Sequence, residues 1–387
     1  MAGFLLGSAG MFATMYSTQA ILPELGRDFH VGPARAGLTI SAVVVAIALG
    51  VWLWGPLSDR IGRRRSIVLA SALLVVPTVA AGLAPNFGAL LACRAAQGLC
   101  MPGLLAVGVP YVMEAFGPWL GGRAMGVYVS ALVAGGLIGR VGVGLATSVV
   151  GWRWAVGGLA VFPLAAVFVM RRWLPDVGPP ARSSGLRRSG IFAQMRNPLL
   201  LRIAFAAAAM FFLFVGVFSY VVFRLQRPPF DLGPAVSSLI FLLWLFGAVG
   251  PYAGKLADRI GWRRAAFGSV VCAGLGLLLS LPSTLPTLVL ALSLVTVSMF
   301  AGVTALQLGV TSASDVDRGA ASAVYFSIYY GCGAVGGYLP GLAWQAWRWN
   351  GVVGAGLGAV SVAALALVSS RDKASSIPRA SHPARSD

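Results

Sequence analysis

The sequence contains few charged residues, and acidic residues are the scarcest of these. Charged residues make up 10% of the 387 positions, against about 25% in soluble proteins, and only 11 are Asp or Glu. Hydrophobic residues make up 58%, and the mean hydropathy is +0.84. This composition excludes a soluble globular protein. Because a spanning helix takes about 20 apolar residues, the chain has room for about twelve spans and no large soluble domain.

Histidine and cysteine are also rare, with 2 and 4 residues. The cysteines lie in apolar runs at no metal-ligand spacing, so we expect no disulfide framework, metal site or other cofactor. His30 and His382 lie outside the apolar runs, which argues against a proton-carrying histidine within the membrane. No G-x-x-x-x-G-K-[ST] phosphate loop occurs, so we expect neither ATP-driven pumping nor an enzyme.

The net charge of +18 comes from 29 Lys and Arg residues. Most of them lie in short loops between apolar runs, the distribution that orients membrane proteins, so the lipid bilayer and not nucleic acid is the expected partner. The bias predicts that both termini are cytoplasmic. The first residues carry no Lys or Arg, and their apolar stretch runs past signal-peptide length, so we expect no cleavable signal peptide.

The apolar runs predict twelve spans in two halves. We expect residues 1–173 and 199–370 to form six helices each, joined by a cytoplasmic linker at 174–198 and followed by a disordered cytoplasmic tail at 371–387. The predicted spans are 3–24, 36–54, 66–84, 87–112, 124–148, 153–173, 199–222, 235–253, 265–282, 286–311, 319–343 and 350–369.

The most specific signal is a cationic segment that occurs twice. Gly55–Arg65 reads GPLSDRIGRRR and Gly254–Arg264 reads GKLADRIGWRR, each between two long apolar runs. Both are predicted to be short turns. Copies half a chain apart predict two related structural units. Cytoplasmic retention would explain the arginines, but not an aspartate and glycines at matching positions.

This repeated segment resembles the loop signature of the major facilitator superfamily, which lies between spans two and three and again between spans eight and nine. Over nearly its whole length the chain resembles the twelve-span bacterial drug:proton antiporter and sugar-efflux branch of this superfamily. The resemblance implies an all-α membrane protein with twelve transmembrane helices in two pseudo-symmetric six-helix bundles.

The resemblance also implies a conformational latch at the cytoplasmic face, in which each aspartate faces a helix N-terminus or an arginine. Glu114 and Arg123 would complete a charge relay with Asp59, and Arg318 is a candidate partner for Asp258. The expected latch residues are Gly55, Asp59, Arg60, Gly62, Arg64, Glu114, Arg123, Gly254, Asp258, Arg259, Gly261, Arg263 and Arg318.

Three charged residues near or within spans are candidates for proton coupling or for a cavity charge. Arg94 lies in a segment that resembles the R-x-x-Q-G motif of span four, although a structural arginine that reaches the membrane surface is the alternative. Arg140 follows a glycine-rich stretch similar to the antiporter signature of span five, where it replaces a proline. Glu24 is the best coupling candidate, with a helix-end charge at the interface as the alternative.

Polar and aromatic groups within the spans suggest a substrate cavity, although each taken singly is more often a packing residue. Together they suit an amphipathic organic compound recognised by shape and a few hydrogen bonds. The candidate cavity residues are Tyr16, Gln19, Gln97, Tyr128, Tyr220, Trp244, Gln307, Tyr325 and Tyr329.

These features predict a secondary active transporter of a small organic solute that works by alternating access as a monomer in the bacterial inner membrane. Proton-coupled efflux of drug-like or sugar-like compounds is the first interpretation, with protons as the coupling ion. A facilitator or symporter for an organic anion or neutral sugar, using Arg94 and Arg140, is the second. A membrane sensor that transports nothing is an alternative from another class.

Overall fold

The computed structural model describes residues 2–175, 192–313 and 318–369, and these residues form helices joined by short turns. In lipid, a chain satisfies its backbone hydrogen bonds within each helix, which is why the apolar runs adopt this form. The linker prediction falls mostly on residues 176–191 and the tail prediction wholly on 370–387, outside the described residues.

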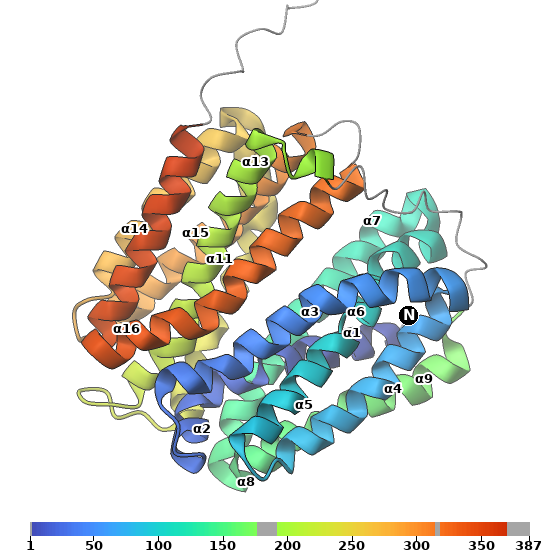
Figure 1. The fold of residues 1–387 in the computed structure, drawn as a ribbon, viewed down its shortest axis with the longest axis horizontal. Coiled ribbons are helices and arrows are strands. Elements are labelled where there is room, and N and C mark those ends of the chain that lie inside the picture. The colour runs from blue at the N-terminus through green and yellow to red at the C-terminus, as the bar shows by residue number, and fades with distance from the viewer. Residues whose placement is uncertain (1, 176–191, 314–317, 370–387) are drawn as a thin grey trace, which may run out of the picture.

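Two sets of helices follow each other along the chain and form two bundles (Figure 1). The first set is α1 (Ala2–Tyr16), η1 (Ser17–Ile21), α2 (Leu22–Asp28), α3 (Pro33–Ile61), α4 (Arg63–Gly82), α5 (Phe87–Cys100), α6 (Pro102–Leu105), α7 (Gly108–Leu137), η2 (Ile138–Gly142), α8 (Val143–Gly158) and α9 (Val161–Trp173). The second set is α11 (Pro198–Leu225), α12 (Pro234–Ser238), η3 (Leu239–Val249), α13 (Gly250–Ile260), α14 (Trp262–Leu279), α15 (Leu285–Ala313) and α16 (Arg318–Val368).

The helices account for the twelve predicted spans. Eight stretches of the described chain are long and apolar enough to cross a membrane, or nine with the bent pair at 234–260. Two of the eight are double-length stretches, broken at Gly151 and at Trp347–Arg348 by non-helical backbone. The predicted first span is also broken, since η1 interrupts it and α2 continues to Asp28.

The repeated cationic segments are mostly helical, which corrects the prediction of a short turn. α3 continues to Ile61 and α13 to Ile260, and the break in each copy falls on one glycine. Gly62 has φ 87° and Gly261 has φ 89°, a left-handed backbone that glycine adopts at little cost. The two copies therefore share a backbone conformation as well as a sequence.

The two bundles contact each other at the end opposite the cationic segments, which we call the outer end. The start of α3 packs on the middle of α16, where a Cβ on Gly37 would overlap the carbonyl oxygen of Gly337. Tyr220 Oη donates to that same carbonyl at 2.7 Å, and Ser41 Oγ donates to Ala334 O at 2.6 Å. From there α3 and α16 diverge toward the cationic segments (Figure 1).

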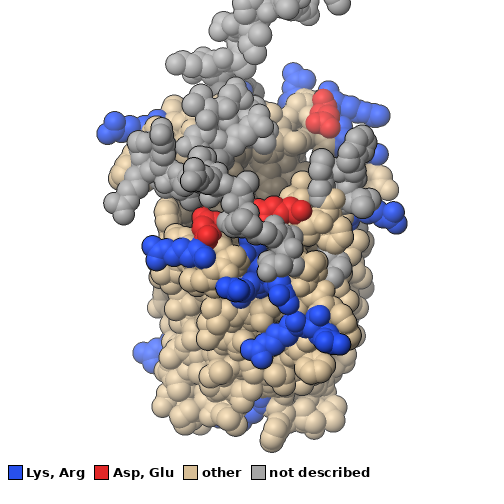
Figure 2. Space-filling view, turned by 90° about the vertical axis from the view of Figure 1, so that its right-hand side faces the viewer, with Lys and Arg blue, Asp and Glu red and all other residues tan. Residues whose placement is uncertain are grey.

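Charged side chains have an uneven distribution over the surface. On the face in Figure 2, most Lys and Arg side chains gather over the upper and middle part, with the Asp and Glu side chains among them. The lower part of that face is mostly uncharged, with a few separate Lys or Arg side chains. An uncharged band beside a cationic end is the surface expected of a helical bundle within a bilayer.

Candidate functional site

The centre of the interface between the bundles contains a fully buried arginine, Arg140. Its guanidinium carbon lies 3.9 Å from the ring centre of Tyr16 and 3.6 Å from that of Trp244, so the group is stacked between the two bundles. Arg140 Nε donates to Gln19 Oε1 at 2.9 Å, and Gln19 Nε2 donates to Ser219 Oγ of the second bundle at 3.1 Å. Residues of both bundles therefore form one polar and aromatic cluster.

The local backbone explains how Arg140 reaches this position. It lies in η2, a five-residue π-helical segment, and such segments are frequent at functional sites. A Cβ on Gly135 would overlap the carbonyl of Ala9, and one on Gly139 that of Ala13. The glycine-rich stretch therefore lets α7 and η2 press against α1, which carries Tyr16.

Among the described residues, no carboxylate balances the charge of Arg140. Its Nη1 donates to Gly136 O at 2.8 Å, whereas Nη2 is buried without a hydrogen-bond partner. In the described parts of the chain, no carboxylate lies within salt-bridge distance of this guanidinium. A buried cation in this condition is costly for the fold, which makes Arg140 a candidate functional residue.

Aromatic residues surround this cluster on the side of the second bundle. Trp244 packs on Phe214 at 4.7 Å between ring centres, and its buried indole Nε1 has no hydrogen-bond partner. Tyr329 of the same bundle stacks on Phe211 at 4.2 Å. The buried Tyr325 hydroxyl also lacks a partner. Besides Arg140, the indole N–H of Trp244 is thus a donor without a partner in this cluster.

The other predicted cavity residues do not join the cluster. Gln97 and Tyr128 are buried inside the first bundle, where they bond to Arg94 and to Leu104 O. Tyr220 closes the contact between the bundles at the outer end. Gln307 is exposed on α15.

Arg94 is as buried as Arg140 but is held entirely by its own bundle. Its guanidinium donates to the carbonyl oxygens of Thr14, Met15 and Thr39 and, at 2.7 Å, to Gln97 Oε1. These four bonds join α1, α3 and α5 of the first bundle, and none of them reaches the second bundle. This geometry favours the structural alternative for Arg94.

Replacing Arg94 with methionine is expected to destabilise the folded protein. Three carbonyl oxygens would lose a charged donor in a dry interior, at about 1–3 kcal/mol for each group left unsatisfied. We expect a strongly lowered thermal unfolding temperature in purified protein. Arg123→Gln, at an exposed position, is the control, and an unchanged unfolding temperature for Arg94→Met would contradict the structural role.

Glu24 lies at the outer end, away from both buried arginines. Its Oε1 accepts from Arg27 at 2.9 Å and from Gln226 of the second bundle at 2.8 Å. Its buried Oε2 has no hydrogen-bond partner. The carboxylate therefore links the two bundles where they are in contact.

The predicted latch residues lie near the end of α3, at the start of α4, within α7 and α13, and at the starts of α14 and α16. Glu114 accepts from Arg63 Nε at 2.8 Å through both carboxylate oxygens, while Asp59, Arg60 and Arg123 are exposed. Gly55 has open space around it.

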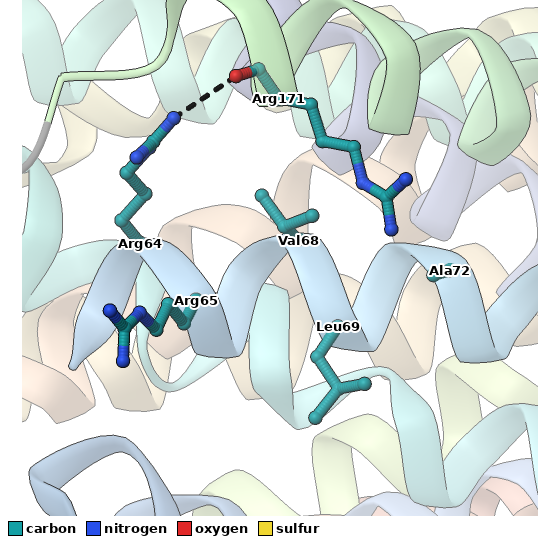
Figure 3. A pocket seen from close by; sticks show the side chains of 6 residues that line it. All are labelled: Arg64, Arg65, Val68, Leu69, Ala72 and Arg171. Carbon is teal, nitrogen blue, oxygen red and sulfur yellow. Dashed lines mark hydrogen bonds between the residues drawn. The ribbon is translucent and has the colours of Figure 1, made fainter. Parts of the chain in front are cut away.

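Arg64 and Arg65, at the end of the first cationic segment, lie near Arg171 of α9. Arg64 Nη2 donates to Arg171 O at 3.0 Å across a cavity that Arg65 and Val68 also line (Figure 3). The side chain of Arg171 points back over α4 in this view.

The second copy of the latch is described in part. Asp258 and Arg259 are exposed. A Cβ on Gly254 would lie 3.9 Å from Thr304 Cγ2, an ordinary contact distance. The guanidinium carbon of Arg263 lies 5.9 Å from the ring centre of Trp262. The side chain of Arg318 lies outside the described residues, so its pairing with Asp258 stays a prediction.

Several residues of these clusters were missed by the sequence analysis. They are Arg63, Phe211, Ser219, Gln226 and Phe241. Ser219 could have been found, because it is a single small polar residue in the long apolar run of α11. Over the described residues, no group of three His, Cys, Asp or Glu side chains is placed to hold a metal ion.

Comparison with known proteins decides the family. The family model of the Major Facilitator Superfamily matches residues 4–337. The chain belongs to the major facilitator superfamily. It is 32% identical to the inner membrane transport protein YnfM of Escherichia coli, over 90% of this chain and 85% of the relative. It is 28% identical to the uncharacterized MFS-type transporter YybF of Bacillus subtilis, over 91% and 88%.

Solved structures agree with this membership at the level of the fold. The nucleoside transporter NupG superposes with a TM-score of 0.78 at 14% identity, over 95% of this chain and 98% of that one. The protein is thus an integral membrane transporter of the superfamily with a small-molecule substrate. The cluster around Arg140 lies where the two bundles of such a transporter meet.

Proposed function

We propose that the protein transports a small organic anion with an apolar or aromatic part, and that Arg140 binds the anionic group. The observation that supports this proposal is the unpartnered Nη2 of a fully buried, un-neutralised guanidinium. A carboxylate or other oxyanion would supply the missing acceptor and the missing charge. The rings of Tyr16 and Trp244 would contact the apolar part.

Alternating access would follow because both bundles contribute residues to this cluster. Tyr16, Gln19 and Arg140 belong to the first bundle, whereas Ser219 and Trp244 belong to the second. A substrate held by both sets would favour conformations in which the bundles are close around it. We place the cationic segments on the cytoplasmic side of a bacterial inner membrane, so the conformation described here would be closed toward the outside. The proposed cycle needs only one copy of the chain, a monomer.

Proton-coupled efflux of drug-like or sugar-like compounds is the second candidate, and Glu24 favours it. Its bond to Gln226 joins the bundles and would break when the outer end opens. The carboxylate would then meet water and exchange a proton with it. Such a residue can couple a proton to the conformational change.

Flux measurements in liposomes test both candidates. We expect organic anions to be transported in preference to organic cations and neutral sugars from the same panel. If Glu24 couples protons, collapsing an imposed pH gradient stops concentrative transport, and Glu24→Gln gives flux that no longer depends on the gradient. Absence of flux for every compound would instead support a sensor that transports nothing.

We retain the latch as a proposal, with a test at Asp59. Asp59→Asn is expected to slow transport by about three- to tenfold, because a bias of about 1 kcal/mol between the two conformations would be lost. The amount of protein in the membrane should stay unchanged. Asp231→Asn, an exposed carboxylate in the loop after α11, is the control. Normal flux in Asp59→Asn would contradict the latch.

A further inference from the structure

A cavity of about 360 Å³ lies at the outer end of the second bundle, away from the cluster around Arg140. It is bounded by the end of α11, the connection from α14 to α15 and the break within α16. Three arginines and three tryptophans line it: Arg224, Arg227, Arg348, Trp344, Trp347 and Trp349. We call it the arginine–tryptophan cavity.

The lining of this cavity is positively charged, with three arginines and no carboxylate among the lining residues. Arg224 is buried and donates to the carbonyl oxygens of Ser280, Leu281 and Pro282, which holds its guanidinium in place. Within the described part of the chain, none of the three arginines forms a salt bridge. Partial burial lowers the pKa of Arg227, and the nearby charge of Arg348 lowers it further.

The corresponding place in the first bundle is neutralised. There α8 breaks at Gly151, with φ 80°, and the next residue, Trp152, is buried and donates Nε1 to Asp28 Oδ2 at 3.2 Å. Arg153 forms a salt bridge with the same carboxylate at 2.9 Å. One aspartate thus balances the arginine of the first break.

In the second bundle an arginine occupies the position of that glycine. α16 breaks at Trp347–Arg348, Arg348 has φ 52°, and the next residue, Trp349, is buried and donates Nε1 to Ser280. A residue with a Cβ is strained at such a φ, whereas glycine is not. Backbone strain that persists where glycine would relieve it points to a functional reason for the side chain.

We propose that the arginine–tryptophan cavity binds an oxyanion, either phosphate or carboxylate, through Arg227 and Arg348. Planar guanidinium groups match the oxygen atoms of such groups and bind them in pairs. Trp344 and the exposed Trp347 would contact the apolar part of the ligand, as tryptophans at a membrane surface do. The ligand is either the headgroup of an anionic phospholipid or a free anion from outside the membrane. This inference does not depend on the proposed role of Arg140.

The test compares the purified full-length protein with its Arg348→Gly and Arg227→Gln variants. Arg348→Gly introduces the glycine that the first bundle has at its break, Gly151, and so relieves the backbone strain at this φ. The unliganded variant should therefore unfold at the same or a higher temperature. Inorganic phosphate is titrated in detergent, and unfolding temperature and tryptophan fluorescence are recorded. In parallel, nanodiscs of phosphatidylglycerol are compared with nanodiscs of phosphatidylcholine.

We expect the wild-type protein to be stabilised by phosphate or by phosphatidylglycerol, and each variant to weaken the apparent affinity by about tenfold or more. Arg35→Gln, an exposed cation near the same end but outside the cavity, should respond like the wild type. Arg140→Met should also keep the response, which separates this cavity from the central cluster.

Each result decides the proposal. A response to phosphate that the variants lose supports it and identifies a free anion as sufficient. A response to phosphatidylglycerol alone, again lost in the variants, supports it and identifies the lipid. No response in either arm, or an equal response in Arg348→Gly, would overturn it.

Discussion

Arg140→Met is expected to abolish most transport while leaving the folded protein intact. The methionine keeps a long apolar side chain between Tyr16 and Trp244 but removes the charge and all donors. Loss of a charged hydrogen bond to the substrate corresponds to about 10- to 100-fold in the transport rate. Because an un-neutralised buried charge is costly, we expect the unfolding temperature to stay the same or to rise.

The matched variant is Arg94→Met, since both arginines are fully buried in the same bundle. The two substitutions are expected to have opposite signatures: Arg94→Met lowers the unfolding temperature, and Arg140→Met lowers the flux at normal stability. Arg140→Lys should have an intermediate flux, because an ammonium group keeps the charge. It does not stack on aromatic rings or form paired hydrogen bonds as a planar guanidinium does. Full anion transport by Arg140→Met would refute the proposed role of this residue.

Gly37→Ala is expected to shift the transporter toward a conformation open at the outer end. The added methyl group would overlap the carbonyl oxygen of Gly337, so α3 and α16 could not approach as closely as they do here. A cost of about 1.4 kcal/mol or more would change the ratio of the two conformations by about tenfold. Transport, which requires both conformations, should fall to a similar degree.

Spin-label distances provide the measurement. One label pair, at Arg35 and Gln345, reports on the outer end, and a second pair, at Arg60 and Arg259, reports on the end with the cationic segments; all four positions are exposed. The four native cysteines are free and would first be replaced. In Gly37→Ala the outer distance should increase and the other distance should decrease.

The control for this experiment is Gly268→Ala, a helical glycine with open space around it. It should change neither distance, since alanine is well tolerated in a helix. Unchanged distances in Gly37→Ala would show that the contact between α3 and α16 does not hold the outer end closed.

Much of the fold could be predicted from local sequence. The apolar runs located the spans, and the repeated G-x-L-x-D-R-I-G-x-R-R segment indicated two related bundles. The error lay in the cationic segments, which were predicted as turns although their helices continue for almost two more turns to Gly62 and Gly261. The charged residues that follow each apolar run stay helical, because water solvates their side chains while the backbone keeps its helical hydrogen bonds.

The candidate site was harder to predict. Tyr16, Gln19, Arg140 and Trp244 were each identified as candidates, but nothing in their order indicated that they meet. Arg94 and Arg140 have the same local signature, an arginine within an apolar helix. Their difference comes from their neighbours, since α1 and α3 provide carbonyl oxygens for one and the second bundle provides an indole ring for the other.

Residue order was therefore enough to establish a helical membrane protein with two related halves, because apolar runs of this length can satisfy their backbone in lipid in only one way. Which arginine lacks a partner, and where the two halves touch, depended on packing. Those properties arise from contacts between residues far apart in the chain, such as Gln19 with Ser219 and Gly37 with Gly337. No local pattern encodes the distance between them.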